Sequence, residues 1–211
     1  MNYNYTNGEQ NQSSGFATEL FEWLEAIAFA LAIVVLLFTF ALRIVSVDGT
    51  SMTPTLQDTD RILVRNIMYT PEDNDIVIII APVGNDPNKP LVKRVIATGG
   101  EYVQIIDGVA YVGTSPDNMV PREVPNVEKI REEKYGDMYD FSAPVYVPQG
   151  FVFVMGDNRN DSLDSRSSML GMVDNRCILG KVIFRIYPFN HFGKIVDGGM
   201  TAALSPVPVM Y

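Results

Sequence analysis

An uncharged run near the N-terminus limits what this chain can fold into more than any other feature. From Ala26 to Leu42 the sequence AIAFALAIVVLLFTFAL contains no charged residue. A helix rises about 1.5 Å per residue, so a run of this length matches a hydrocarbon core of about 30 Å. Trp23 lies where an aromatic interface anchor belongs, and Arg43 can extend to the polar surface at the other end. The sequence therefore predicts a single membrane-spanning helix over residues 26–45.

Two other interpretations fit this run less well. An amphipathic core helix would carry polar residues at about every third or fourth position, and this run has only Thr39. A cleavable secretory signal would begin with Lys or Arg and end in a small-residue cleavage site. Residues 1–25 contain no Lys or Arg, and they contain four glutamates. We therefore expect a polar, acidic tail over residues 1–25 and an anchor that is retained.

The remainder of the chain has the pattern of a β domain. From residue 46 to residue 197, short runs rich in β-branched and aromatic residues alternate with Gly, Pro, Asn and Asp. The apolar run over residues 76–83 suits a buried strand and is too short to span a membrane. Asp107-Gly108 joins two such runs and predicts a hairpin. We expect a mostly β fold with a coiled antiparallel, barrel-like sheet, followed by a loosely ordered tail over residues 198–211.

Composition excludes several classes of function. The chain carries 16 Lys and Arg against 25 Asp and Glu, a formal charge of −9, whereas a nucleic-acid-binding protein needs a basic face for the phosphates. The single Cys177 cannot form an internal disulfide or a thiolate metal cluster, and we expect it to be a small buried hydrophobe. The single His191 leaves no second imidazole for a zinc site and one candidate base for a Ser-His-Asp triad. We expect chemistry without a metal or a cofactor.

The first segment suited to catalysis is VDGTSMTPTLQDTDRILV, residues 47–64. Gly49 and Pro54 bracket Ser51 in a predicted turn, where a serine can present its hydroxyl and lend its backbone N–H to a developing oxyanion. A Gly-x-Ser in a loop is usually only a turn. It is also not the Gly-x-Ser-x-Gly elbow of the hydrolases, because Thr53 occupies the position of the last glycine.

The second segment is PLVKRVIATGGEYV, residues 90–103. On a strand, Lys93 shares one face with Leu91 and Val95, which places an amine in an apolar row. By base rates such a lysine extends to the surface. If it is buried instead, its pKa falls and the neutral amine can act as a general base. Arg94 falls on the opposite face, where we expect it to meet water.

The third segment is FVFVMGDNRNDSLDSR, residues 151–166, in which a dense polar cluster follows a buried strand that ends at Gly156. An ordinary solvated loop is one interpretation. A calcium loop is another, although the bidentate Glu that ends such loops is missing. The third is a hydrogen-bonded loop packed against a catalytic strand, in which an Asp–Arg pair fixes the shape and Ser162 orients an amine.

Together these segments resemble the conserved boxes of the bacterial type I signal peptidases, a family of membrane-anchored Ser/Lys proteases. The family's nucleophile box is similar to SMTPTL at residues 51–56, and its lysine box is similar to KR at 93–94 with Gly-Gly-Glu close behind. Its last box is similar to the run over residues 156–166. The resemblance covers residues 20–196 and implies a mostly β fold of coiled sheets with a variable cap inserted over residues 114–146.

The resemblance implies a role for each matched residue. Ser51 is the nucleophile and its backbone N–H belongs to the oxyanion hole, Lys93 is the general base, and Ser162 orients the Lys93 amine. Some members carry a serine as second oxyanion donor at the position of Gly49, so that donor is backbone or water here. Five residues support the loop: Asp157, Asn158, Arg159, Asp164 and Arg166. The shallow substrate pockets are lined by Val45, Val47, Met52, Leu56, Ile62, Ile80 and Val92.

The resemblance also implies substrates and a location. Family members remove signal peptides from exported preproteins, typically after Ala-x-Ala, and the substrate binds extended, adding a strand to a sheet edge. Only eight residues separate Leu42 from Ser51, so we expect the site near the membrane surface and close to the protein-export channel. The implied topology is single-pass in the cell membrane, with a cytoplasmic N-terminus and an extracytoplasmic domain. The positive-inside rule favours the opposite, because residues 1–25 lack Lys and Arg.

Three alternatives stay open at this stage. A self-cleaving Ser/Lys repressor relative would share the catalytic fold, but the chain has a membrane anchor and no helix-turn-helix pattern. A catalytically silent, membrane-tethered binding module would be favoured by the loss of Ser51 or Lys93, and both are present. A Ser-His hydrolase would use His191, whose sequence setting is typical of a turn.

Overall fold

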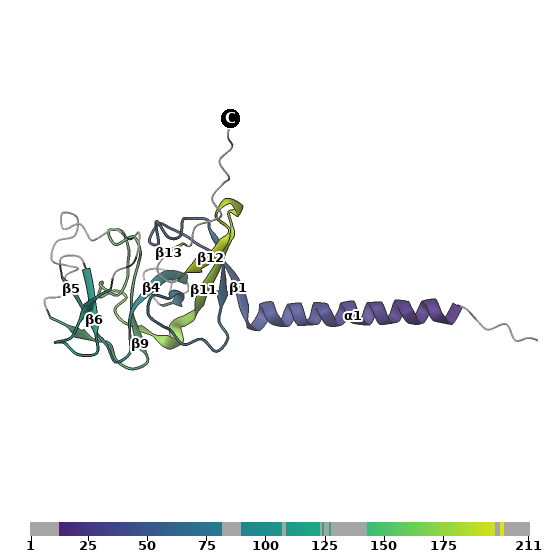
Figure 1. Cartoon of the computed structure of the whole chain (residues 1–211), viewed down its shortest axis with the longest axis horizontal. Coiled ribbons are helices and arrows are strands. Elements are labelled where there is room, and N and C mark those ends of the chain that lie inside the picture. Colours follow the sequence, from purple (N-terminus) through teal and green to yellow (C-terminus); the bar gives the residue numbers. More distant parts are fainter. Residues whose placement is uncertain are drawn as a thin grey trace, which may run out of the picture. The chain divides into compact units, whose positions relative to one another are not determined.

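In the computed structural model the chain forms two units, Met1–Ala41 and Leu42–Tyr211 (Figure 1). The first unit contains one helix, α1, over Ser13–Phe40. Its segment Gly15–Phe40 is long and apolar enough to cross a membrane by length and composition. The residues that the structure describes are 13–81, 90–106, 109–122, 124, 127, 143–196, 199 and 200.

The bounds of α1 differ from the predicted segment at both ends. The helix begins at Ser13, so Glu19, Glu22 and Glu25, which precede the uncharged run, are helical, in keeping with the good helix propensity of Glu, Leu and Ala. It ends at Phe40, and Leu42–Ser46 forms the strand β1. The β-branched Ile44 and Val45 favour a strand, and in this strand they pair with Leu63 and Ile62.

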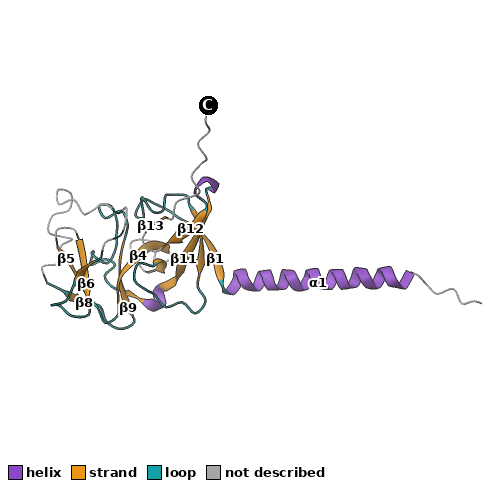
Figure 2. Ribbon diagram, viewed as in Figure 1, coloured by secondary structure: helices purple, strands orange, loops and turns teal. Residues whose placement is uncertain are grey.

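The second unit is built from two antiparallel sheets (Figure 2). In the larger sheet the order is β1-β2-β11-β3-β4-β9-β10, and β12 pairs with β11 and β13. The smaller sheet has the order β7-β6-β5-β8. The strands of the larger sheet are β1 (Leu42–Ser46), β2 (Arg61–Arg65), β3 (Ile76–Ile80), β4 (Pro90–Thr98), β9 (Phe151–Met155), β10 (Val173–Asp174), β11 (Ile178–Tyr187), β12 (Gly193–Val196) and β13 (Gly199–Met200). Those of the smaller sheet are β5 (Tyr102–Ile106), β6 (Val109–Gly113), β7 (Val120–Pro121) and β8 (Val145–Tyr146).

The predicted mostly β, antiparallel fold is confirmed. The sheet does not close into a barrel in the described part of the chain, because β1 and β10 end its path without pairing with each other. The predicted hairpin is present, since Ile106 pairs with Val109 across two residues that lie outside the described ones. Most of the segment 114–146, including nearly all of 126–139, also lies outside them. Its described parts include β7 and β8, which are the two edge strands of the smaller sheet.

At the C-terminal side, strand β13 (Gly199–Met200) lies beyond the predicted boundary at residue 197. Strand β13 pairs with β12 through Ile195 and Met200, so a strand follows where a loosely ordered tail is predicted. Residues 201–211 lie outside the described residues.

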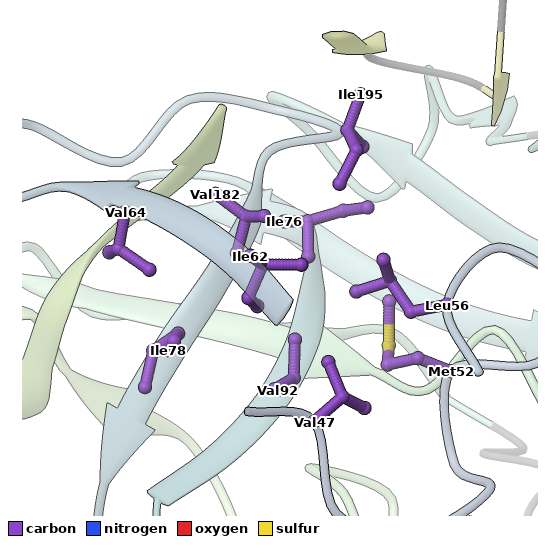
Figure 3. Close-up of a cluster of buried hydrophobic side chains, with 10 residues drawn as sticks. All are labelled: Val47, Met52, Leu56, Ile62, Val64, Ile76, Ile78, Val92, Val182 and Ile195. Carbon is purple, nitrogen blue, oxygen red and sulfur yellow. The ribbon is translucent and has the colours of Figure 1, made fainter. Parts of the chain in front are cut away.

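Three clusters of buried side chains form the core. The first lies beneath the loop that joins β1 to β2 and includes Val47, Met52 and Leu56 from that loop (Figure 3). The second lies between β4, β9 and the smaller sheet, and contains Phe153 and Ile105. The third contains Val77 and Val154, with the half-buried Cys177 packed against it, so Cys177 contributes to packing as a small hydrophobe.

Candidate active site

The loop between β1 and β2, residues 47–60, presents Ser51. The two ends of the loop are joined by two backbone hydrogen bonds, from Val47 N to the Asp60 carbonyl at 2.8 Å and from Thr59 N to the Val47 carbonyl at 3.0 Å. Gly49 has a φ of +97°, which favours glycine, and its N–H donates to Asp58 Oδ1 at 2.9 Å. Because that N–H is occupied, the Gly49 backbone is not the second oxyanion donor in this arrangement.

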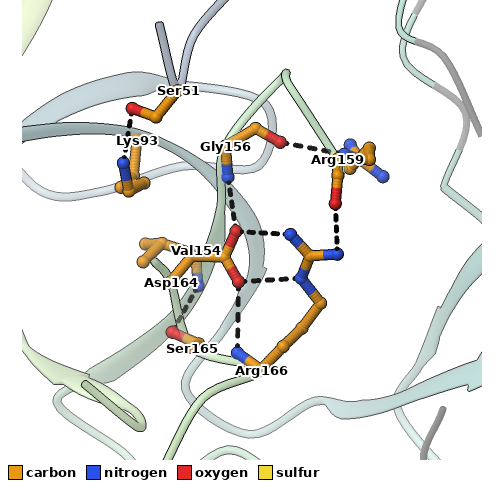
Figure 4. Close-up of polar contacts among 8 residues, drawn as sticks. All are labelled: Ser51, Lys93, Val154, Gly156, Arg159, Asp164, Ser165 and Arg166. Carbon is orange, nitrogen blue, oxygen red and sulfur yellow. Dashed lines mark hydrogen bonds and ion pairs between the residues drawn. The ribbon is translucent and has the colours of Figure 1, made fainter. Parts of the chain in front are cut away.

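Lys93 is buried on β4 and reaches the Ser51 hydroxyl. The two atoms Lys93 Nζ and Ser51 Oγ lie 2.7 Å apart, within hydrogen-bond distance (Figure 4). Only 2% of Lys93 is exposed, since β4 lies between β3 and β9 inside the larger sheet. Burial lowers the pKa of Lys93 from 10.5 to about 8, with Asp164 opposing and Arg166 reinforcing the shift. A substantial fraction of the amine is therefore neutral near physiological pH.

The loop that follows β9 docks against the Ser51 loop. Asn158 N donates to the Ser51 carbonyl at 3.0 Å, and Asn158 Nδ2 donates to the Thr50 carbonyl at 3.2 Å. The Thr50 hydroxyl also contacts Asp161 Oδ2 at 3.4 Å. These contacts tie the backbone at Thr50 and Ser51 to the polar loop.

Gly156 permits this close approach. A Cβ built on Gly156 would clash with the Ser162 side chain and with the Ser51 carbonyl oxygen. Glycine is required here for space, because its φ lies outside the left-handed region.

Asp164 and Arg166 form a buried, bidentate ion pair. Arg166 Nε and Nη2 donate to the two carboxylate oxygens of Asp164 at 2.8 Å each, and both side chains are fully buried. Gly156 N also donates to Asp164 Oδ2 at 2.9 Å, and Arg166 Nη1 donates to the Arg159 carbonyl at 2.8 Å (Figure 4). Burial opposes ionisation of Asp164, but the hydrogen bonds and charge of Arg166 outweigh it and lower the pKa of the carboxyl.

Arg159 completes the same loop. Its Nε donates to the Gly156 carbonyl at 3.1 Å, and its N–H donates to the Asp157 carbonyl at 3.0 Å. Burial lowers the pKa of Arg159 to about 10, which leaves it charged at neutral pH.

Ser162 lies beside Asp164 in the polar loop. Its buried Oγ is close enough to the Asp164 carboxylate to help lower the pKa of that carboxyl, while the Lys93 amine bonds to Ser51. The side chain also lies against Gly156, at the junction of the two loops. Orientation of the amine by Ser162 stays a prediction.

Arg94 was predicted to meet water, and this is wrong. It is fully buried, and its Nε and Nη2 donate to the two oxygens of Asp157 at 2.8 and 2.7 Å. The same carboxylate accepts from the Thr55 hydroxyl at 2.5 Å. Asp157 therefore joins β4 to the Ser51 loop, and the polar loop supplies the partner that lets Arg94 be buried.

A second buried pair holds the Ser51 loop from β11. Arg185 Nε lies 3.0 Å from Asp60 Oδ2, and Arg185 Nη2 donates to the Thr55 carbonyl. Thr55 is thus held at both its hydroxyl and its carbonyl. Sequence reasoning missed Thr55, Arg185 and Asp60 as supports of the site, since no local pattern links residues so far apart.

The predicted pocket residues fall into two groups. Val47, Met52, Leu56, Ile62 and Val92 belong to the first core cluster, and Val45 packs against it. Leu56 and Ile62 have no exposed surface, so in this structure they support the wall of the site and offer nothing for a substrate to touch. Ile80 lies outside the cluster and is 37% exposed.

His191 takes no part in this arrangement. It lies in the short 3-10 turn η3, Phe189–His191, and the described hydrogen bond of the Ser51 hydroxyl is with Lys93. A Ser-His mechanism therefore has no support in the geometry.

Comparison with known proteins decides the family. The model of the family "Signal peptidase, peptidase S26" matches residues 20–187. This chain belongs to that family. The chain is 35% identical to signal peptidase I of Bacillus licheniformis over 88% of this chain and 98% of the relative. It is 34% identical to signal peptidase I S of Bacillus subtilis over 83% of this chain and 93% of the relative. The protein is thus a serine protease of a family that cleaves signal peptides.

A solved structure is also similar. The crystal structure of a signal peptidase I from Enterococcus faecalis shares 27% identity with this chain, covers 54% of it and 97% of its own length, and superposes with a TM-score of 0.39.

The close approach at Gly156 generates a first prediction. Gly156→Ala would push the added methyl group into Ser162 and the Ser51 carbonyl, and a displacement of the nucleophile by about 1 Å can cost about 100-fold in rate. We expect a loss of that order in kcat, measured with a signal-peptide substrate in detergent. Gly193→Ala is the control, because a Cβ there meets nothing within 4 Å. Parent-like kcat for folded Gly156→Ala would contradict this account.

The double anchoring of Thr55 generates a second prediction. Thr55→Val keeps the shape of the side chain but removes the hydrogen bond to the buried Asp157 carboxylate, a loss of about 1.5–3 kcal/mol in the free energy of unfolding. Thr55→Ser keeps the hydroxyl and should stay close to the parent. Urea unfolding of both variants measures the difference. Equal stability of the valine and serine variants would show that the hydrogen bond contributes nothing.

Proposed function

We propose that this protein is a Ser/Lys endopeptidase that cleaves signal peptides from exported preproteins at the membrane surface. The observation that carries the proposal is the 2.7 Å approach of the buried Lys93 amine to the Ser51 hydroxyl. A buried amine with its pKa near 8 supplies the base that serine needs, without histidine.

The chemistry follows from the geometry. Neutral Lys93 Nζ accepts the Ser51 proton as Oγ attacks the scissile carbonyl carbon. The Ser51 N–H has no hydrogen-bond partner within the described residues and is available to the developing oxyanion. The Lys93 ammonium then gives its proton to the leaving amine, and an acyl-enzyme forms. Water activated by the same amine hydrolyses the acyl-enzyme and restores Ser51.

The ion pairs serve as supports in this mechanism. Asp164 and Arg166 fix the loop that carries Asn158, and Asn158 fixes the Ser51 carbonyl. Neither Asp164 nor Asp157 transfers a proton in this mechanism, because Asp164 is paired with Arg166 and Asp157 with Arg94.

For the substrate we propose an extended segment with small side chains, of the Ala-x-Ala type, before the cleaved bond. It would add a strand beside the Ser51 loop, against the walls backed by the first core cluster. The partly exposed Val45 and Ile80 are the predicted pocket residues with accessible surface.

For the location we propose that α1 anchors the protein in the cell membrane, with the catalytic domain on the extracytoplasmic side near the export channel. The apolar segment Gly15–Phe40 supports an anchor, and the short chain from Phe40 to Ser51 supports a site near the lipid surface. The acidic residues before the anchor run against the positive-inside rule, so the orientation rests on the family's function.

Three substitutions test the proposed dyad. Ser51→Ala and Lys93→Ala should each reduce cleavage of an Ala-x-Ala preprotein by about 1,000-fold or more, since each removes one half of a unit that acts together. His191→Ala should leave cleavage close to that of the parent. The assay uses the full chain in detergent. Retained cleavage in Lys93→Ala, or its loss in His191→Ala, would refute the dyad.

The pKa of Lys93 also predicts a pH profile. Below pH 8 the amine is protonated and cannot accept the Ser51 proton, so kcat/KM should fall about tenfold per pH unit. Above pH 8 it should reach a plateau. A profile governed by a single group that titrates near 6.5, as an unperturbed histidine does, would contradict the assignment of Lys93 as the base.

A further inference from the structure

Strand β11 carries a buried arginine on the face of the sheet that the first core cluster covers. Arg185 is opposite Ile62, a member of that cluster, and residues opposite each other in an antiparallel pair point to the same face. Arg185 is 1% exposed and its partner Asp60 is 2% exposed. Burying two charges is costly, and apolar side chains of similar volume often give equal or greater stability. Stability therefore does not account for this ion pair, which points to a role in holding a particular geometry.

The second partner of Arg185 belongs to the turn that follows the nucleophile. Arg185 Nη2 donates to the Thr55 carbonyl. Leu56 N donates to the Met52 carbonyl at 2.8 Å, which closes a single turn that includes Thr55. Because Met52 directly follows Ser51, a shift of the Thr55 carbonyl would be passed through this turn to the nucleophile.

The Asp60 carboxylate joins the same guanidinium to the end of the Ser51 loop. Arg185 Nε lies 3.0 Å from Asp60 Oδ2, and the same oxygen accepts from Gln57 N at 2.9 Å. The planar guanidinium thus connects two parts of the loop through donors in a fixed fork. A lysine at residue 185 would keep the charge but would lack this fork.

The Ser51 turn and the Lys93 amine are held by different elements. Lys93 lies on β4, whereas Ser51 is held from the polar loop through Asn158 and from β11 through Arg185. The distance of 2.7 Å between Lys93 Nζ and Ser51 Oγ therefore depends on where these two supports place the turn.

We propose that Arg185 is a positioning residue for the reaction: by holding the Thr55 carbonyl, it sets where the Ser51 hydroxyl lies relative to Lys93, and so sets the rate of the chemical step. This inference rests on the proposed Ser/Lys dyad. Arg185 is buried away from solvent and does not meet the substrate, so its effect falls on kcat and not on KM.

The pH profile separates this role from an effect on the base. The charges that influence the pKa of Lys93 are those of Asp164, Arg166 and Asp157. Arg185 acts on the Ser51 turn instead. Its substitution should therefore lower kcat and leave the midpoint of the kcat/KM profile near pH 8.

Arg185→Lys tests the proposal in the full chain in detergent, with a signal-peptide substrate and with kcat normalised to the folded fraction from circular dichroism. We expect kcat to fall by about tenfold or more, because a misplacement of about 1 Å can cost about 100-fold. KM and the pH midpoint should stay those of the parent. Asp60→Asn is a second variant, which weakens one contact of the guanidinium and keeps its bond to Thr55, so kcat should fall by a smaller factor.

Lys181→Met is the matched control on the same strand. Lys181 pairs with the buried Asp75, which also accepts from the Tyr69 hydroxyl at 2.6 Å and from Glu72 N at 3.2 Å. This second ion pair of β11 holds the turn before β3. Its loss should lower the midpoint of thermal unfolding and leave kcat close to that of the parent.

The outcomes separate the inference from the proposed function. Parent-like kcat for folded Arg185→Lys would overturn the inference, and parent-like kcat for Asp60→Asn would do so if the lysine variant does not fold. A shifted pH midpoint in Arg185→Lys, or an equal fall of kcat in Lys181→Met, would overturn it as well. Absence of cleavage by the parent, or retained cleavage in Lys93→Ala, would instead refute the proposed function.

Discussion

The burial of the Lys93 amine against the Ser51 hydroxyl is the constraint on which the rest of the site depends. A lysine at the surface has a pKa near 10.5 and is protonated at neutral pH, so it cannot accept a proton. Burial lowers the pKa of Lys93 to about 8. At about 1.4 kcal/mol for each pKa unit, this shift costs about 3 kcal/mol of folding stability at neutral pH. The cost is full below pH 8 and disappears as the pH rises towards 10.5. Pairing of β4 on both sides and the surrounding apolar core offset it.

The charged residues near Lys93 are arranged so that they do not raise its pKa back to the ordinary value. An unpaired carboxylate beside the amine would stabilise the ammonium form and raise the pKa. Asp164 has that effect, but Arg166, in bidentate contact with it, acts in the opposite direction. Asp157 is paired in the same way with Arg94. The two ion pairs thus hold the loops together, and burial remains the largest influence on the pKa of Lys93.

Much of this arrangement follows from local sequence. The uncharged run predicted the helix, the alternation of apolar residues predicted the antiparallel strands, and the apolar row around Lys93 raised the possibility of a buried amine. The pairing of Asp164 with Arg166 was within reach because the two residues are close in the chain. The burial of Arg94 was missed because its partner, Asp157, lies 63 positions away. Thr55 was missed for the same reason, since its partners lie 102 and 130 positions away. Strand alternation gives the face of a side chain, but the neighbouring loop decides whether that face meets water.

A direct titration of the Lys93 amine would test the central claim most clearly. The full chain in detergent, with isotope-labelled lysine side chains, would be followed by NMR across pH, with Lys93→Met identifying the resonance. The account predicts one lysine that titrates at about pH 8, well below the others, and that is absent from the variant. A Lys93 resonance that titrates above pH 10 would show that the amine is protonated under working conditions, and the Ser/Lys mechanism would then have no base.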